Sequence, residues 1–359
     1  MSDFSFGDAL RVTVFGQSHA PAVGCVIEGY PAGERIDWDA VRAFMQRRAP
    51  GRDALSTPRR ESDLPNVVSG LNGEGLTCGA PITAIIENTN VRSSDYDLLK
   101  DVPRPGHADL TALFKYGSAA DLRGGGPFSA RLTAPIVFAG ALALQYLQKK
   151  GVRVAAHIAS IGDVEDVSPD PVCPTLPMYG PDDFPVIDRA AGERMKALIL
   201  SCKQEGDSVG GVVRLIAAGL PQGLGGPLFG GLEGRLSMAM FAIPAVKGVA
   251  FGEGFDASRM TGSAHNDPYC VKDGRPVPLT NHAGGLLGGI TTGLPIRMTV
   301  AFKPTPSIAR EQKSVSLAAL RECPLSVPGR HDPCVVPRAV PVVEAMAALT
   351  LCDVMLKGA

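Results

Sequence analysis

Residues 121–131 read Asp-Leu-Arg-Gly-Gly-Gly-Pro-Phe-Ser-Ala-Arg, three consecutive glycines that lead straight into a long apolar segment. Glycine adopts positive φ angles at little cost, so such a turn lets backbone N–H groups approach a ligand closely. The free N–H groups and dipole of a helix behind the turn favour an anion. Arg123 and Arg131 flank the glycines, and a guanidinium holds a phosphate or carboxylate through two hydrogen bonds. The stretch is as typical of a phosphate-binding turn as of a tight turn that only caps a core helix.

The apolar segment behind the glycine turn predicts a long central helix over residues 130–150, ended by Gly151. Alternating apolar residues predict two early strands, at residues 10–14 and 23–28, joined by a hairpin-like loop. Further strands are expected at residues 81–88, 151–161, 209–217, 246–251 and 294–302, and further helices at residues 188–203, 232–241 and 341–356, the last with Pro341 at its first position.

A helix that begins after Asp37 is well signalled, because Asp37 can cap it and Ile36 can pack against Val41. Arg48 falls on the apolar side of this helix at its C-terminal end, so it must either extend to water or meet an anion. More arginines lie close by, at positions 47, 52, 59 and 60. This basic segment is as consistent with a solvated face as with a substrate-binding surface.

The overall composition is that of a loop-rich globular protein of 359 residues. Glycine and proline contribute 42 and 30 residues, yet 45% of the chain is hydrophobic, which excludes a disordered chain. The 35 basic and 36 acidic side chains give a net charge of -1. We therefore expect neither nucleic acid nor an anionic membrane as a partner, and any anion site must be local.

The eight cysteines never occur at C-x-x-C spacing, and no secretory signal precedes them. This pattern predicts reduced thiols and a cytoplasmic protein. The longest apolar stretch, residues 134–144, is far shorter than the ~20 residues that span a bilayer. His331 and Cys334 are two potential ligands, which do not make a metal site, so we expect no metal.

Two histidines fall on loops. His19 follows Ser18 between the first two strands, and His107 lies in the turn of residues 104–109, which two prolines and a glycine restrict. Each histidine can act as a proton donor or can simply be a loop residue. A Ser–His nucleophile is disfavoured, because adjacent side chains rarely point at each other. A second glycine-rich stretch, residues 281–289, allows a flat ring or a phosphate to approach closely.

Taken together and in order, these motifs resemble the chorismate synthase family. The resemblance rests on Gly16-Gln17-Ser18-His19, Arg104-Pro105-Gly106-His107-Ala108-Asp109, Arg123-Gly124-Gly125-Gly126, Asn281-His282-Ala283-Gly284-Gly285, Lys303-Pro304-Thr305-Pro306-Ser307 and Gly329-Arg330-His331-Asp332-Pro333-Cys334. It runs from about residue 7 to residue 355 and leaves no domain over. It implies an α+β fold, one domain over residues 1–359, in which antiparallel sheets sandwich helices (a β-α-β sandwich). It also implies a homotetramer.

The resemblance also implies a reaction, the 1,4-elimination of phosphate from 5-enolpyruvylshikimate 3-phosphate to give chorismate, with reduced FMN as cofactor. By similarity, His19 protonates the departing phosphate, His107 protonates or neutralises the reduced flavin, and Asp332 assists the flavin in taking the ring proton. Substrate contacts are implied at Ser18, Arg48, Arg104, Arg131 and Arg330, and flavin contacts at Ser129, Ala245, Gly288, Lys303, Pro304, Thr305, Pro306, Ser307 and Arg330.

Four residues, in three places, depart from the family pattern. Ala20 replaces a glycine after the first histidine, Pro127-Phe128 replace two side-chain donors to the flavin, and Pro244 replaces an asparagine. Some members contact NADP through an arginine just after the first helix ends, where this chain has Ala54 with Arg52 nearby. An NADPH site is therefore implicated near Arg48 and Arg52, and it stays open whether the flavin is reduced by NADPH on this chain or by a separate flavin reductase.

Two rival functions remain. A phosphotransferase with a nucleotide loop at Gly124–Gly126 would place Lys-Ser or Lys-Thr after the glycines, whereas this chain has Pro-Phe-Ser. A flavin-binding protein without catalysis would explain the glycines and arginines, but it would not explain two histidines on restrained loops.

Overall fold

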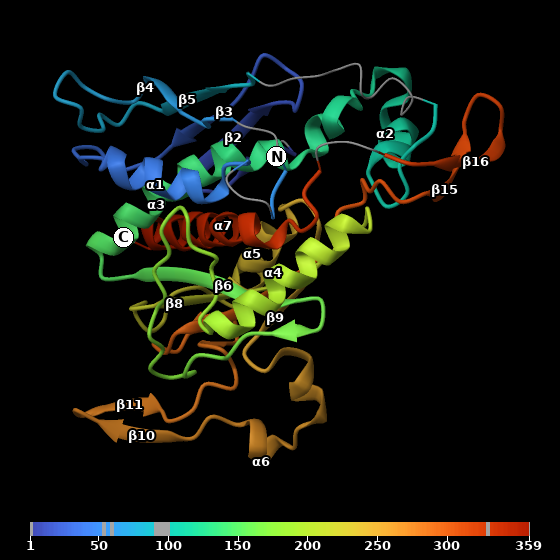
Figure 1. Cartoon of the computed structure of the whole chain (residues 1–359). Helices are drawn as coiled ribbons and strands as arrows, with labels where there is room; N and C mark the ends of the chain where they lie inside the picture. The colour runs from blue at the N-terminus through green and yellow to red at the C-terminus, as the bar shows by residue number, and fades with distance from the viewer. Residues whose placement is uncertain (1–2, 52–54, 58–60, 90–100, 328–330, 359) are drawn as a thin grey trace.

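The computed structural model describes residues 3–51, 55–57, 61–89, 101–327 and 331–358. Two five-stranded antiparallel sheets enclose a layer of helices (Figure 1). One hydrophobic cluster extends from the first sheet through the helices to the second sheet. The predicted α+β sandwich of antiparallel sheets around helices is therefore confirmed.

The first sheet has the strand order β1-β2-β3-β5-β4. Its strands are β1 (Ser5–Phe6), β2 (Arg11–Gly16), β3 (Ala22–Glu28), β4 (Asn66–Ser69) and β5 (Ile82–Glu87). The predicted hairpin of β2 and β3 is confirmed, with Val14 opposite Cys25. Alternation places Val23, Cys25 and Ile27 in the core, and the loop that carries Ser18 and His19 lies at the end of this hairpin.

The second sheet has the order β7-β6-β8-β14-β9. Its strands are β6 (Arg153–Ile161), β7 (Val164–Glu165), β8 (Gly211–Ala218), β9 (Val246–Phe251) and β14 (Ile296–Phe302). In β14 the residues Ile296, Met298, Val300 and Phe302 are buried while those between them are half-buried, as the alternating sequence predicts. The end of β14 leads directly into residues 303–307.

The helical layer contains α1 (Trp38–Arg48), α3 (Thr133–Lys149), α5 (Leu232–Phe241) and α7 (Val336–Lys357). Helix α3 packs on β3 and β5, α7 packs on β6 and β8, and the two helices pack on each other (Figure 1). Two helical stretches, Ala130–Lys149 and Val336–Lys357, are long and apolar enough to cross a bilayer, and most of each is buried inside the fold. Both stretches are longer than the longest apolar run in the sequence, residues 134–144, because each helix also includes less apolar residues.

Helix α1 begins as predicted, with the Asp37 carboxylate accepting hydrogen bonds from the N–H groups of Asp39 and Ala40 at 3.0 Å. Ile36 and Val41 are both buried, as expected of a hydrophobic staple. The remaining helices are α2 (Asp109–Tyr116), α4 (Arg189–Gln204) and α6 (Gly262–His265), with short 3-10 turns η3 (Gly117–Ala119), η4 (Arg123–Phe128), η5 (Ala130–Leu132), η6 (Leu228–Gly230) and η7 (Gly254–Arg259). Three two-stranded hairpins lie outside the sandwich, β10 (Tyr269–Lys272) with β11 (Arg275–Pro278), β12 (Leu286–Leu287) with β13 (Ile290–Thr291), and β15 (Gln312–Ser316) with β16 (Arg321–Leu325).

Two helix boundaries differ from the sequence predictions. Helix α7 begins at Val336, so Pro341 lies inside it and Pro337 occupies the first turn, where a missing N–H costs least. The glycine turn does not run straight into α3, because Ser129 stands between η4 and η5 and its hydroxyl accepts a hydrogen bond from the N–H of Arg131. The three glycines are therefore separated from the N-terminus of α3, which weakens the case for an anion held by that helix dipole.

Candidate functional site

A cavity of about 620 Å³ lies where the glycine turn, the 104–109 loop, the end of α5, residues 302–307 and the start of α7 meet. This volume is in the range of small-molecule and cofactor sites. Ten of the residues implied by the resemblance line it, namely Arg48, Arg104, His107, Ser129, Ala245, Lys303, Thr305, Pro306, Ser307 and Asp332. Segments more than 200 positions apart in the sequence thus form a common wall.

The glycine turn lies close to both loop histidines. Gly124 and Gly125 have φ angles of 59° and 89°. A Cβ atom at Gly124 would lie 2.2 Å from Cε1 of His19, and one at Gly125 would lie 3.2 Å from Nε2 of His107. Only glycine fits both the backbone conformation and the space, so the three glycines allow both imidazoles to approach the turn closely.

His19 faces its sequence neighbour. Its Nδ1 lies 3.2 Å from Oγ of the fully buried Ser18, contrary to the expectation that adjacent side chains diverge. The backbone N–H of Ser18 donates to the carbonyl of Gly126 at 3.2 Å, which ties this loop to the glycine turn. The hydroxyl therefore orients the imidazole.

His107 belongs to a second hydrogen-bonded group. Its Nδ1 lies 2.6 Å from Oδ1 of Asp109, and Arg104 donates to the same carboxylate from Nε at 2.7 Å and from Nη2 at 2.8 Å. Nη1 of Arg104 donates to the hydroxyl of Ser307 at 3.1 Å. Burial raises the pKa of Asp109, but its hydrogen bonds with Arg104 and His107 outweigh burial and hold that pKa well below the usual range. The carboxylate is therefore ionised.

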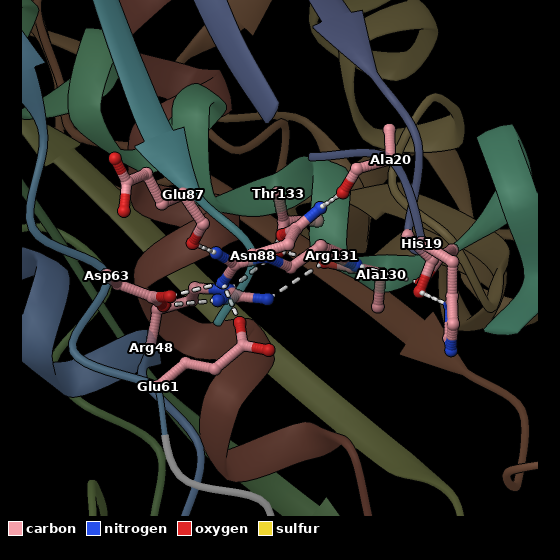
Figure 2. A network of polar contacts seen from close by, with 12 residues as sticks. His19, Ala20, Arg48, Glu61, Asp63, Glu87, Asn88, Ala130, Arg131 and Thr133 are labelled. Atoms are coloured by element: carbon pink, nitrogen blue, oxygen red, sulfur yellow. Dashed lines mark hydrogen bonds and ion pairs between the residues drawn. The ribbon is translucent and has the colours of Figure 1, made fainter. Parts of the chain in front are cut away.

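Arg48 and Arg131 meet on the carboxylate of Asp63 (Figure 2). Arg48 also donates from Nε to the hydroxyl of Thr133 at 3.0 Å, and Arg131 pairs with Glu61 at 2.6 Å. Of the two equal interpretations of the basic segment, the solvated face is wrong for Arg48, which is 4% exposed. Arg52, Arg59 and Arg60 lie outside the described residues.

Burial governs the electrostatics of this pair. It lowers the pKa of Arg48 to about 10, against the opposing attraction of Asp63, so the guanidinium stays charged at neutral pH. Burial also raises the pKa of Asp63, but the charges of Arg48 and Arg131 outweigh it and leave that pKa below its ordinary value. The arginine charges are therefore largely balanced within the chain.

Asn88 connects this arginine group to the His19 loop (Figure 2). Its Oδ1 accepts from Nε of Arg131 at 2.7 Å, while its Nδ2 donates to the carbonyls of Ala20 at 2.7 Å and Gln17 at 3.1 Å. The Asn88 side chain is therefore hydrogen-bonded both to Arg131 and to the loop that carries His19.

Asp332 lies at the start of α7 with both carboxylate oxygens engaged. Oδ1 accepts from the backbone N–H of Thr57 at 2.9 Å, and Oδ2 accepts from Nη1 of Arg338 at 2.5 Å. Nε of Arg338 donates to the carbonyl of Arg48, the last residue of α1, at 2.9 Å. Arg338 therefore joins α1, α7 and Asp332 at one wall of the cavity.

The residues at the end of β14 fit an anionic cofactor. The hydroxyl of Thr305 is buried, and the described residues offer it no hydrogen-bond partner, so it is available to a ligand. Burial lowers the pKa of Lys303, and the charge of Lys247 lowers it further, so an anion between the two lysines would relieve their repulsion. Phe128, which is 40% exposed, adds an apolar surface to the cavity wall.

Several residues in the cavity wall or next to it were missed from the sequence. Asp109 stood inside a motif that drew attention only to its histidine, and Arg338 follows the last motif by a few positions. Lys247 had no local signal. His331 was considered only as a metal ligand, yet it lines the cavity beside Arg104 and His107. Among the residues that the structure describes, no group of three His, Cys, Asp or Glu side chains is placed to hold a metal.

Other implied site residues lie outside the cavity wall. Ser18, His19, Arg131 and Pro304 each adjoin a lining residue without being one. Gly288 lies on the exposed turn between β12 and β13 and does not reach the cavity of its own chain. Arg330 lies outside the described residues.

Comparison with known proteins identifies the family. The family model described as chorismate synthase matches residues 10–356. The chorismate synthase of Archaeoglobus fulgidus is 47% identical, covering 98% of this chain and 97% of its own length, and that of Lancefieldella parvula is 44% identical, covering 99% and 97%. A solved crystal structure of chorismate synthase superposes with a TM-score of 0.77 at 29% identity, covering 98% of this chain and 93% of that chain. The chain therefore belongs to the chorismate synthase family of carbon–oxygen lyases.

Proposed function

We propose that this chain converts 5-enolpyruvylshikimate 3-phosphate into chorismate by 1,4-elimination of phosphate, with reduced FMN bound in the cavity. The observation that carries the proposal is the approach of His19 and His107 to neighbouring glycines of the glycine turn, next to a cavity lined by His107, arginine and lysine. Such a site combines proton donors with charges that suit an anionic substrate. When bound, a reduced flavin supplies electron density that eases departure of the phosphate.

The residues at the end of β14 would hold the flavin. The unpartnered hydroxyl of Thr305 and the ammonium groups of Lys303 and Lys247 suit its polar edge and its phosphate. Phe128 offers apolar contact in place of hydrogen bonds. This supports flavin binding with fewer side-chain donors than the family pattern provides.

The chain's own residues would move protons and balance charge. His19, oriented by Ser18, is placed to protonate a departing phosphate. His107, next to Gly125 of the same turn, lines the cavity and is placed to donate or hold a proton there. Arg48 lines the cavity, so a substrate anion would compete with Asp63 for its guanidinium. Asp332, fixed by Thr57 and Arg338, is placed as a hydrogen-bond acceptor.

Phosphate release from the substrate under anaerobic conditions, with dithionite-reduced FMN, tests the proposal. Replacing His19 or His107 by asparagine is expected to lower turnover by roughly 10²–10⁴-fold, because each removes a proton-transfer group. His265→Asn, on α6, is the matched control and is expected to retain the activity of the unaltered enzyme. Absence of phosphate release from the unaltered protein would refute the proposed reaction, and flavin binding without turnover would favour a flavin-binding protein.

The source of reducing equivalents needs a separate measurement. Aerobic turnover with FMN and NADPH as sole reductant would place NADPH reduction on this chain, with Arg48 as the implied contact. Product formed only with pre-reduced flavin would require a separate flavin reductase. We further propose a cytoplasmic homotetramer, as the family resemblance implies, and sedimentation of the purified protein tests the assembly.

A further inference from the structure

The carboxylate of Asp109 is the most heavily engaged acceptor beside the predicted catalytic residues. Asp109 is the first residue of α2 and is 1% exposed. Its carboxylate accepts four hydrogen bonds. Three come from the backbone N–H, Nε and Nη2 of Arg104, and the fourth comes from Nδ1 of His107. Because an ionised carboxylate can only accept hydrogen bonds, each of these contacts requires a proton on nitrogen.

This requirement decides which ring nitrogen of His107 is protonated. Nδ1 lies 2.6 Å from Oδ1 of Asp109 and 3.1 Å from Nη2 of Arg104. A guanidinium only donates, so a bond from Arg104 to Nδ1 would need an unprotonated Nδ1 facing a carboxylate. The shorter, charge-assisted contact with Asp109 prevails, and Nη2 of Arg104 is instead satisfied by Oδ1 at 2.8 Å.

The opposite ring nitrogen then faces the glycine turn. Nε2 of His107 is the ring atom nearest to a Cβ built at Gly125, at 3.2 Å, and the glycine leaves that side open. The loop is held in place, because Gly106 has a φ of 73°, the N–H of His107 donates to the carbonyl of Arg104, and Ser314 of β15 donates to the carbonyl of Pro103.

We propose that Asp109 is a positioning residue that fixes His107 as the Nδ1–H tautomer and leaves Nε2 as the nitrogen that exchanges a proton in the cavity. Arg104 acts in the same group, since it anchors the Asp109 carboxylate to Ser307 rather than presenting a free guanidinium. The role of Nε2 in proton exchange rests on the proposed function of His107. The assignment of the Nδ1–H tautomer rests on the hydrogen bonds alone and is independent of that function.

Solid-state ¹⁵N NMR of the flavin-free protein, labelled at the histidine rings, reads the tautomer directly. The resonances of His107 are identified by their loss in His107→Gln. The neutral imidazole of His107 is expected to carry its proton on Nδ1 and none on Nε2. Asp109→Asn is expected to shift His107 to the other tautomer or to a mixture, because an amide can donate as well as accept. A neutral ring that carries its proton on Nε2 instead of Nδ1 in the unaltered protein, or an unchanged tautomer in Asp109→Asn, would overturn the proposal.

Kinetics with reduced flavin separate positioning from a general structural effect. Asp109→Asn is expected to lower kcat by roughly 10–10³-fold with little change in KM, since the imidazole is present but wrongly protonated. The double variant with His107→Asn is expected to be no slower than His107→Asn alone, because both changes act through one group. Fully additive losses would overturn the proposal. Asp256→Asn, an exposed carboxylate on η7, is the control for a lost charge and is expected to leave kcat unchanged.

A folding defect in Asp109→Asn would not leave the question open. The NMR measurement of the His107 tautomer in the unaltered protein then tests the proposal without that variant. Ser307→Ala offers a second variant, because it removes a hydrogen bond of Arg104 and leaves the Asp109 carboxylate in place. Failure of the proposed reaction would appear as absence of turnover in every variant, with the NMR result standing independently.

Discussion

Asp63 adopts a φ of 50°, a left-handed conformation that costs an L-residue with a side chain about 1–2 kcal/mol. The ion pairs of its carboxylate with Arg48 and Arg131 offset that cost, because charge-assisted hydrogen bonds contribute about 1.5–3 kcal/mol each. Both arginines are almost fully buried and would be strongly destabilising if left unpaired. Asp63 therefore keeps a buried cationic site stable in the absence of an anionic ligand.

His331 gives stability a dependence on pH. Burial, together with the charges of Arg104 and His107, lowers its pKa from 6.5 to about 4. A neutral imidazole in the folded state means that the unfolded chain binds the extra proton between these values. The free energy of unfolding is therefore expected to fall as the pH decreases from about 6.5 to about 4, by up to about 1.4 kcal/mol per pH unit from this residue.

Urea unfolding across this pH range tests the expectation, with His331→Gln as the comparison. The variant should show a shallower slope, although His157, whose pKa is also lowered mainly by burial, contributes in the same direction in both proteins. Identical slopes would mean that the pKa of His331 is the same in the folded and the unfolded protein, which would contradict the expected shift.

At the scale of elements, the glycine turn η4 acts as a spacer between two loops. A Cβ at Gly124 would meet the imidazole of His19 and Oγ of Ser18 at 2.2–2.5 Å, and one at Gly126 would lie 1.9 Å from the carbonyl oxygen of Asp121. Side chains are therefore excluded from these glycine positions both by the close contacts and by the positive φ angles.

Gly124→Ala is expected to lower turnover by roughly 10²-fold, because the methyl group must displace His19 and small misplacements of a catalytic group have effects of this size. Gly75→Ala is the control, since its φ is 76° but a Cβ there would meet nothing within 4 Å. Steady-state kinetics and thermal unfolding of both variants separate the two effects. Equal activity losses would indicate backbone strain rather than displacement of His19.

At the scale of the whole molecule, the two sheets are held together by the contact of α3 with α7. Gly140 allows this close approach, because a Cβ there would lie 2.3 Å from Cβ and 2.5 Å from Cα of Ala345. Both residues are buried in the core that the sheets share. The spacing of these helices also sets where α7 presents Arg338 and Asp332 relative to α1.

Gly140→Ala is expected to destabilise the fold by about 1–3 kcal/mol through overpacking, which outweighs the gain of about 1 kcal/mol in helix propensity. Gly234→Ala in α5 is the matched control, since a Cβ there meets nothing within 4 Å and only the propensity gain remains. Urea unfolding measures both. Adding Ala345→Gly should recover part of the loss, and a stabilised Gly140→Ala would contradict the close packing of α3 and α7.

The local structure follows from the amino-acid sequence alone. The cap at Asp37, the staple of Ile36 with Val41, the β2–β3 hairpin and the bounds of α5 and β9 follow from contacts within a few residues, and all are confirmed. The ordered motifs were also sufficient to indicate the family, because their order and spacing are properties of the chain alone.

The pairing of charged side chains depends on the packing of segments that are far apart in the sequence. Arg48 is bound by Asp63 and Thr133, which lie 15 and 85 positions away in the sequence. Arg104 is bound by Ser307, which lies 203 positions away. No periodicity or turn signal reports such pairings, because they arise from the packing of the sheets on the helices. The sequence therefore showed that arginines and histidines are present, while the fold decided that carboxylates balance the arginines and that Asp109 lies against His107.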